Sequence, residues 1–149
     1  MSNVFPRQIT APPIRAVASN GCYIIDENGK RYFDGSGGAA VSCLGHGDPD
    51  VIKAIQDQTS KMAFAHTGFF SSDPAEELAE LLVQHAPGEL DRVYFVSGGS
   101  EAVEAALKLA RQFHIENGEP KRRHIIARKQ SYHGNTLGAL AAGGNKWRR

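Results

Sequence analysis

The sequence predicts an α/β fold from three observations. A short run of β-branched and aromatic residues at 92–96 leads through a glycine pair into a helical pattern. A second apolar run at 124–127 follows that helix, giving the strand–helix–strand order of a parallel crossover. Alternating residues flank Asn28 and Gly29, a dipeptide that strongly favours a β hairpin. The chain is therefore expected to open with a small antiparallel piece and to continue with a parallel or mixed sheet.

The first 47 residues predict an extended arm and then the hairpin. Pro6, Pro12 and Pro13 interrupt any periodicity in residues 1–13. The hairpin strands are expected within residues 22–26 and 31–34. Residues 35–40 are too rich in glycine for the interior of a helix or strand, so a loop is predicted there.

Three helices are predicted in the remainder. Asp48 and Asp73 each precede a proline, which places a capping carboxylate before proline at the first helical position. The third helix follows the glycine pair, and Glu104 and Lys108 form an expected exposed i,i+4 pair on it. Asn117 and Gly118 should end it. The apolar positions of the three helices are Val51, Ile52 and Ile55, then Leu78, Leu81 and Leu82, then Val103, Ala106, Leu107 and Ala110.

Composition limits the class of protein. The 149 residues are 41% hydrophobic and 22% charged, with a formal net charge of +1, which gives no electrostatic case for nucleic acid or membrane. Cys22 and Cys43 lack C-x-x-C spacing, so reduced thiols in a cytoplasmic protein are expected. The chain shows no signal peptide and no apolar run of membrane-spanning length.

The glycine loop at 97–100 is the first candidate site. A strand, glycine turn and helix place unpaired N–H groups at the positive helix end, which suits a phosphate; a tight turn alone would explain the glycines equally well. Neither a P-loop nor a G-x-G-x-x-G fingerprint is present. Because loops after parallel strands meet at one sheet edge, the loop at 130–136 is expected to converge on the first, which favours a site.

Several segments in order resemble the class III (subgroup II) aminotransferases of fold type I, which use pyridoxal 5'-phosphate (PLP). The matching segments are GCYIID at 21–26, YFDG at 32–35, LGH at 44–46, SGGSEAVEAALK at 97–108 and SYHG at 131–134. The resemblance implies the N-terminal portion of this fold. Residues 1–47 would be the arm and hairpin of a small domain, and 48–149 the incomplete beginning of the PLP-binding large domain.

The resemblance also implies roles for individual residues. Gly99 and Ser100 would hold the PLP phosphate through backbone N–H groups, with the Ser100 hydroxyl adding a bond. Tyr132 would stack on the pyridine ring, and His133 would have a positioning or hydrogen-bonding role. Loops 35–45 and 64–72 match regions near the substrate, often at a dimer interface. Phe69 and Phe70, in the second of these loops, would be interface or pocket residues.

No catalytic residue is assigned. The family's Schiff-base lysine and the aspartate that pairs with the ring nitrogen have no counterpart here, so the 149-residue chain alone is expected to be inactive. None of the lysines of this chain has the sequence context of the family's Schiff-base lysine; they are Lys30, Lys53, Lys61, Lys108, Lys121, Lys129 and Lys146. The histidines show no metal-ligand spacing, so no metal is expected; they are His46, His66, His85, His114, His124 and His133.

The expected activity is amino-group exchange between an amine or amino-acid donor and an oxo acid, in a cytoplasmic homodimer without nucleic acid or membrane partners. Three alternatives stay open. One is an aminomutase, lyase or decarboxylase on the same fold, and another is a noncatalytic dimerising domain. The third is a nicotinamide-binding domain in which Arg128 or Lys129 meets a 2'-phosphate, although the dinucleotide fingerprint is missing.

Overall fold

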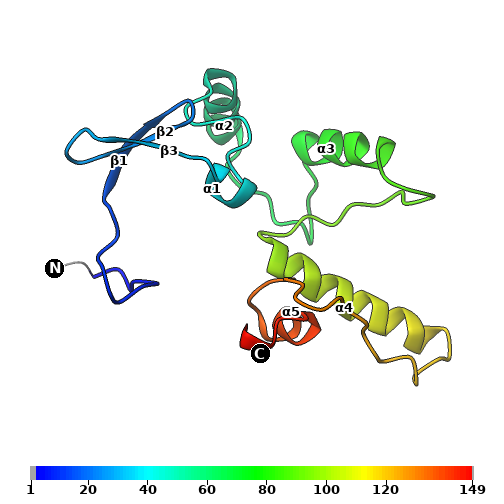
Figure 1. Cartoon of the computed structure of the whole chain (residues 1–149). Coiled ribbons are helices and arrows are strands. Elements are labelled where there is room, and N and C mark those ends of the chain that lie inside the picture. Colours follow the sequence, from blue (N-terminus) through cyan, green and yellow to red (C-terminus); the bar gives the residue numbers. More distant parts are fainter. Residues whose placement is uncertain (1–2, 149) are drawn as a thin grey trace. The chain divides into compact units, whose positions relative to one another are not determined.

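The computed structural model describes residues 3–148 (Figure 1). The chain forms two compact units, which divide after residue 72. The first unit holds a small sheet and two helices, and the second holds three α-helices and a short 3-10 turn. The predicted assignment of residues 1–47 and 48–149 to the small and large domains of the family stays a prediction.

A three-stranded antiparallel sheet opens the chain, in the order β1 (Ala16–Asn20), β2 (Tyr23–Asp26) and β3 (Arg31–Phe33). The predicted β2–β3 hairpin is confirmed. Gly29 turns the chain at a φ of 78°, and the Asp26 carboxylate accepts N–H groups of the turn and the Tyr32 hydroxyl. Strand β1 was not predicted, because AVASN carries little β signal of its own.

The glycine-rich segment after β3 contains a short helical turn, α1 (Gly37–Ala40), where the sequence predicted a loop. Gly38 and Ala39 have φ values of 58° and 63°, and Ala40 follows at 67°. These are left-handed conformations, which glycine adopts freely and alanine adopts at a cost of about 1–2 kcal/mol. The helical assignment therefore reflects a left-handed turn and not an ordinary helix.

Helices α2 (Pro49–Lys61) and α3 (Asp73–Gln84) confirm the two predicted aspartate–proline starts. Asp48 lies just before α2 and its carboxylate accepts the N–H groups of Asp50 and Val51, both at 3.0 Å. Helix α3 begins at Asp73 itself, whereas a capping aspartate would lie just before the helix, so the helix begins one residue earlier than predicted. Local capping chemistry thus located both helices to within a residue.

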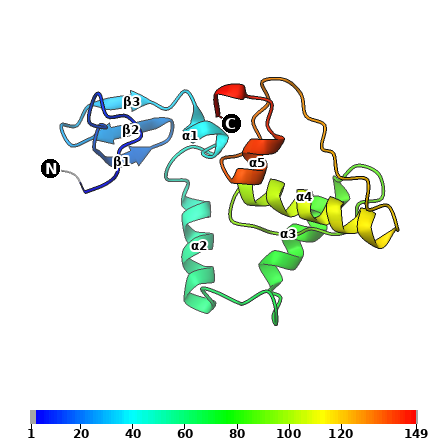
Figure 2. The ribbon, with the colours of Figure 1, turned by 90° about the horizontal axis from the view of Figure 1, so that it is seen from below.

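The second unit is built on α4 (Gly99–Glu116), which begins at the glycine pair and ends before Asn117, as predicted. Helix α5 (Leu137–Ala142) packs beside α4, and Figures 1 and 2 both show the two side by side. The 3-10 turn η1 (Lys146–Arg148) follows. The segment between α4 and α5 carries the second predicted loop of the site.

The two strands predicted at residues 92–96 and 124–127 are not formed. Both segments lie outside helix and sheet, and the sheet found among residues 3–148 contains β1, β2 and β3 alone. A strand requires ladder hydrogen bonds to a neighbouring strand. Neither segment pairs with another among the described residues, so the predicted parallel crossover is not formed within residues 3–148.

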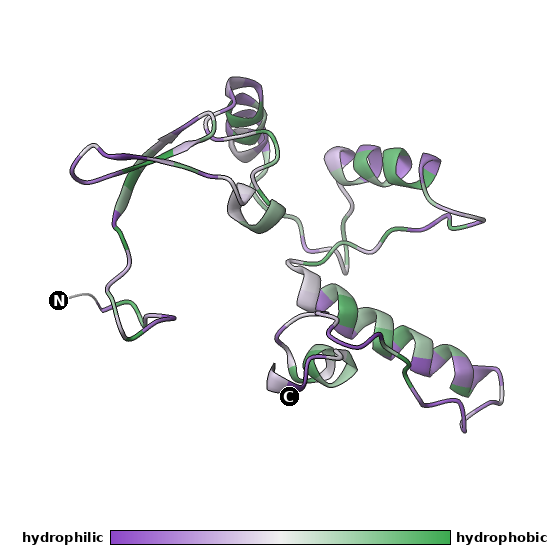
Figure 3. Cartoon of the chain, in the orientation of Figure 1, coloured by the Kyte–Doolittle hydropathy of each residue, from purple (hydrophilic) through white to green (hydrophobic). Residues whose placement is uncertain are grey.

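The apolar faces of the helices remain largely uncovered. Ala139 and Asp26 are the buried non-glycine side chains of the part of the chain that the structure describes. Figure 3 shows hydrophobic and hydrophilic residues alternating around α4, as its sequence period requires. No helix within residues 3–148 combines the length and the apolar character needed to cross a membrane.

Candidate functional site

Helix α4 begins with an open amino-terminal end. Its N-cap residue is Gly98, in extended conformation at a φ of −169°, and the first intrahelical bond runs from the Ala102 N–H to the Gly98 carbonyl. The N–H groups of the first three helical residues, Gly99, Ser100 and Glu101, precede that bond and have no partner within the helix. A glycine N-cap has no side chain to accept from them. The helix end therefore offers several donors and the positive end of its dipole to an anion.

The two glycines of this loop are not needed for its backbone shape. Neither Gly98 nor Gly99 has a left-handed φ, and a Cβ built on either would meet no atom of the chain within 4 Å. An alanine could therefore stand at either position without a clash inside this structure. The described residues therefore give no backbone or packing reason for the glycine pair.

The loop at 130–136 meets this helix end directly. The Ser100 hydroxyl donates to the side-chain carbonyl of Asn135 and accepts the Asn135 N–H, both at 3.0 Å. Gly134 lies so close that its Cβ, if present, would be 2.8 Å from the Cα of Ser100. The convergence of the two loops predicted from the sequence is therefore present, although the strands that were expected to bring it about are not.

Tyr132 and His133 stand on this second loop, two and one residues before Gly134. Tyr132 is 61% exposed and His133 is also exposed. An exposed aromatic ring in a polar loop can lie against a flat ligand. The structure thus brings Gly99, Ser100, Tyr132 and His133 onto two joined loops, while the Ser100 hydroxyl is already paired with Asn135.

Sequence reasoning missed the role of Glu104. It was expected to form an exposed pair with Lys108, but its half-buried carboxylate accepts the Gly138 N–H at 2.8 Å. The Thr136 hydroxyl and the N–H of Gly138 lower the pKa of Glu104 below its usual range, and Lys108 contributes less. The partner lies 34 residues along the chain, so no local pattern could have indicated it.

The first unit holds a second polar cluster, around Asp34. Its carboxylate accepts the Gly38 N–H and the hydroxyls of Ser36 and Ser42, and pairs with His46 Nε2 at 2.9 Å. The hydrogen bond from His46, followed by the one from Gly38, lowers the pKa of Asp34 to about 2. The loop is also joined to the sheet by two backbone bonds between Gly21 and His46. These contacts hold the left-handed turn in place.

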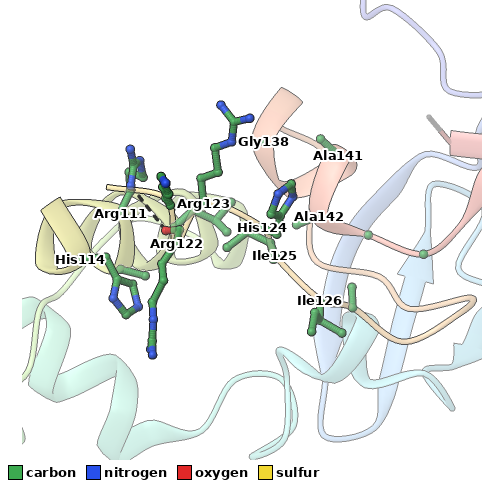
Figure 4. Close-up of a pocket in the computed structure, with 16 residues that line it drawn as sticks. Arg111, His114, Arg122, Arg123, His124, Ile125, Ile126, Gly138, Ala141 and Ala142 are labelled. Atoms are coloured by element: carbon green, nitrogen blue, oxygen red, sulfur yellow. Dashed lines mark hydrogen bonds between the residues drawn. The ribbon is translucent and has the colours of Figure 1, made fainter. Parts of the chain in front are cut away.

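A hollow of the second unit lies elsewhere. It has a volume of about 1150 Å³ and is lined by α4, by the segment 121–127 and by α5 (Figure 4). Arg111 Nη1 crosses it to the Arg122 carbonyl at 3.4 Å. None of the four predicted site residues lines it. The hollow follows the uncovered sides of the helices and not the glycine loop.

Known proteins of one family match nearly the whole of this chain. The family model for class-III aminotransferases matches residues 4–148. The chain belongs to the class-III aminotransferase family. It is 50% identical over 137 residues to an uncharacterised aminotransferase of Schizosaccharomyces pombe, covering 92% of this chain and 30% of that protein. The family resemblance stated from sequence motifs is thereby confirmed.

Solved transaminases share the fold of this class-III aminotransferase chain. An (S)-enantioselective omega-transaminase from Thermomicrobium roseum matches 99% of this chain and 34% of its own, with a TM-score of 0.91 and 36% identity. A PLP-bound amine transaminase from an uncultivated Pseudomonas species matches 100% and 35%, with a TM-score of 0.91 and 33% identity. The chain therefore spans about a third of the length of its relatives, and the predicted fold class is confirmed.

Proposed function

We propose that this chain supplies the phosphate-binding and ring-supporting part of a PLP-dependent transaminase, which exchanges an amino group between an amine or amino acid and an oxo acid. The observation that carries the proposal is the open glycine loop at the start of α4, joined to the loop that bears Tyr132. Membership of the class-III family and the likeness to a PLP-bound amine transaminase support it.

The residues present fit the cofactor. The space where a Cβ at Gly98 or Gly99 would stand is open to a phosphate, which would accept the N–H groups of Gly99 and Ser100. Because the Ser100 hydroxyl is paired with Asn135 in both directions, we assign it to holding the loop, while the backbone binds the anion. Tyr132 would lie against the ring, and His133 beside it would orient the cofactor.

The chemistry that PLP supplies is electron withdrawal from the carbanion left when an amine substrate loses its α-proton. The residues of this chain would bind and orient the cofactor: the Gly99 and Ser100 amides would hold its phosphate, and the Tyr132 side chain would limit motion of its ring. Both functions are needed before any proton transfer, since a reacting group must be held in a productive geometry.

A homodimer in the cytoplasm belongs to the same proposal. Phe69 and Phe70 are 82% and 66% exposed in the segment 64–72, which suits an interface between copies of the chain. Cys22 and Cys43 are free thiols, which suits a reducing compartment. Sedimentation of the full-length gene product would test the dimer, and a monomer at micromolar concentration would contradict it.

Replacing Gly99 by valine tests the phosphate site. In the full-length gene product we expect the PLP dissociation constant to rise at least about tenfold, because the valine would displace the phosphate from charge-assisted bonds. Gln112→Val is the matched control, since Gln112 is exposed near the other end of α4. A Cβ at Gly99 would not clash with the chain, so the variant should fold. Unchanged PLP affinity would then show that this loop does not bind the cofactor phosphate.

Two substitutions of Tyr132 test the ring contact. Tyr132→Phe should retain most of the PLP affinity, whereas Tyr132→Leu should weaken it about fivefold, since offset stacking contributes about 1 kcal/mol. The circular dichroism of the bound cofactor should change with leucine only. Equal affinity and spectra for both variants would show that Tyr132 does not stack.

The activity itself is tested by mixing the full-length gene product with PLP, a primary amine and an oxo acid. We expect ping-pong kinetics, in which the amino group leaves with one product before the second substrate binds. The 149-residue chain alone should show no turnover. A full-length product that decarboxylates or eliminates without amino transfer would favour the other PLP chemistries.

A further inference from the structure

Glu104 joins α4 to α5, next to the two loops of the candidate site. It lies on α4 about one turn after Ser100, and its Oε1 accepts the Gly138 N–H at 2.8 Å. Gly138 is the second residue of α5, which follows the loop bearing Tyr132. The carboxylate therefore satisfies one of the amides that the start of a helix leaves unpaired.

The space around this carboxylate is shaped by a glycine. A Cβ built on Gly138 would lie 2.6 Å from Glu104 Oε1 and 2.8 Å from its Cδ. Gly138 does not have a left-handed φ, so its backbone does not require glycine. The absence of a side chain at 138 makes room for the carboxylate of Glu104.

The charge of Glu104 is stabilised where it stands. The nearby Thr136 hydroxyl and the Gly138 amide lower its pKa, with smaller contributions from Ala139 and Lys108. The Gly138 N–H donates to the carboxylate, whereas Thr136 Oγ1 is buried without a hydrogen-bond partner among the described residues. The Glu104 carboxylate is therefore ionised at neutral pH and accepts the Gly138 bond as an anion. Hydrogen bonds to a charged acceptor are about twice as strong as neutral ones.

We propose that Glu104 is a positioning residue for the loop at 130–136, which it fixes against α4 together with Ser100. The first residues of this loop bond Gly144, which follows α5, so the loop and α5 are tied to each other. Held to α4 by the Ser100–Asn135 contact alone, they could pivot about that contact. The second attachment, at Gly138, removes this freedom and sets where Tyr132 and His133 stand relative to the α4 amides. The cofactor part of this inference rests on the proposed function.

Three variants of the full-length gene product test the role. Glu104→Ala removes the carboxylate, Gly138→Ala pushes it away while keeping its charge, and Glu104→Gln keeps its size and one acceptor. Glu116→Gln is the control, because Glu116 is exposed at the far end of α4. The readouts are hydrogen exchange of amides 137–140 without cofactor, the PLP dissociation constant, and the circular dichroism of bound PLP.

We expect Glu104→Ala and Gly138→Ala each to speed exchange at Gly138 about tenfold, to raise the PLP dissociation constant about fivefold and to alter the dichroism. The double variant should be no worse than either single one, because both break the same contact. Glu104→Gln should be intermediate and remains informative if Glu104→Ala does not fold. The control should match the wild type.

The outcomes separate the two proposals. Wild-type exchange at Gly138 in Glu104→Ala and Gly138→Ala, or additive effects in the double variant, would overturn the positioning role. Faster exchange with unchanged PLP affinity and dichroism would overturn its link to the cofactor. If the wild type itself failed to bind PLP, the proposed function would fail, while the exchange rates would still decide whether Glu104 holds α5.

Discussion

Replacing Gly134 by alanine should open the junction between the two loops of the site. Gly134 is buried and has a φ of 128°, a conformation that L-residues rarely adopt. The added Cβ would lie 2.8 Å from both the Cα and the Cβ of Ser100, where the backbone atom cannot move aside cheaply. The alanine must therefore either be strained or move the loop.

The cheaper of these two responses sets the magnitude. Keeping the junction closed combines an unfavourable φ, at about 1–3 kcal/mol, with overpacking, at about 1–3 kcal/mol. Opening it loses the two hydrogen bonds between Ser100 and Asn135, at about 1 kcal/mol each. We expect the loop to open, so the junction should be destabilised by about 2 kcal/mol, which is roughly a 30-fold shift of the opening equilibrium.

Hydrogen exchange at the Asn135 amide measures that shift, because this N–H donates to the Ser100 hydroxyl. Gly99→Ala is the matched control. Its Cβ meets no atom of the chain, and its φ is not left-handed, so exchange at Asn135 should stay at the wild-type rate. If Gly134→Ala also exchanged at that rate, the close approach of Gly134 to Ser100 would not exist in solution.

Two further predictions concern the first unit. Because the bonds from His46 and the Gly38 amide lower the pKa of Asp34 from 3.8 to about 2, its contribution to stability is present above the unfolded value and is lost as the pH falls from 3.8 to about 2. Carboxyl NMR titration checks this, and His46→Ala should move the midpoint towards 3.8. Asp48→Ala should cost about 1 kcal/mol by removing the α2 cap. Asp57→Ala is the control for urea unfolding, since its exposed pair with Lys53 contributes less than about 0.5 kcal/mol.

Local chemistry accounts for the elements that sequence reasoning located. The turn at Gly29, the carboxylate of Asp48 and the glycine pair before α4 each act within a few residues, so their signals are contained in short stretches. The predicted helix period of α4 is likewise a local property. Such features can be found without knowing what packs against them.

Features that depend on distant partners were predicted poorly. β1 exists because β2 pairs with it, and its own residues favour a strand only weakly. The segments 92–96 and 124–127 have suitable residues but no paired neighbour, so they form no strand. Glu104 satisfied an i,i+4 pattern with Lys108, which concealed its contact with Gly138. The residues of a segment can favour a strand, but the strand forms only where a neighbouring segment pairs with it.

The contact between Ser100 and Asn135 also has a consequence for biosynthesis. It closes a segment of 35 residues, at an entropic cost of about 3 kcal/mol, whereas α4 forms from contacts close in sequence. During translation the helix can therefore form before residues 130–138 have left the ribosome. A nascent chain would present the start of α4, which we propose to bind phosphate, before the loop that bears Tyr132. Under that proposal the phosphate site would form earlier in synthesis than the contact to the cofactor ring.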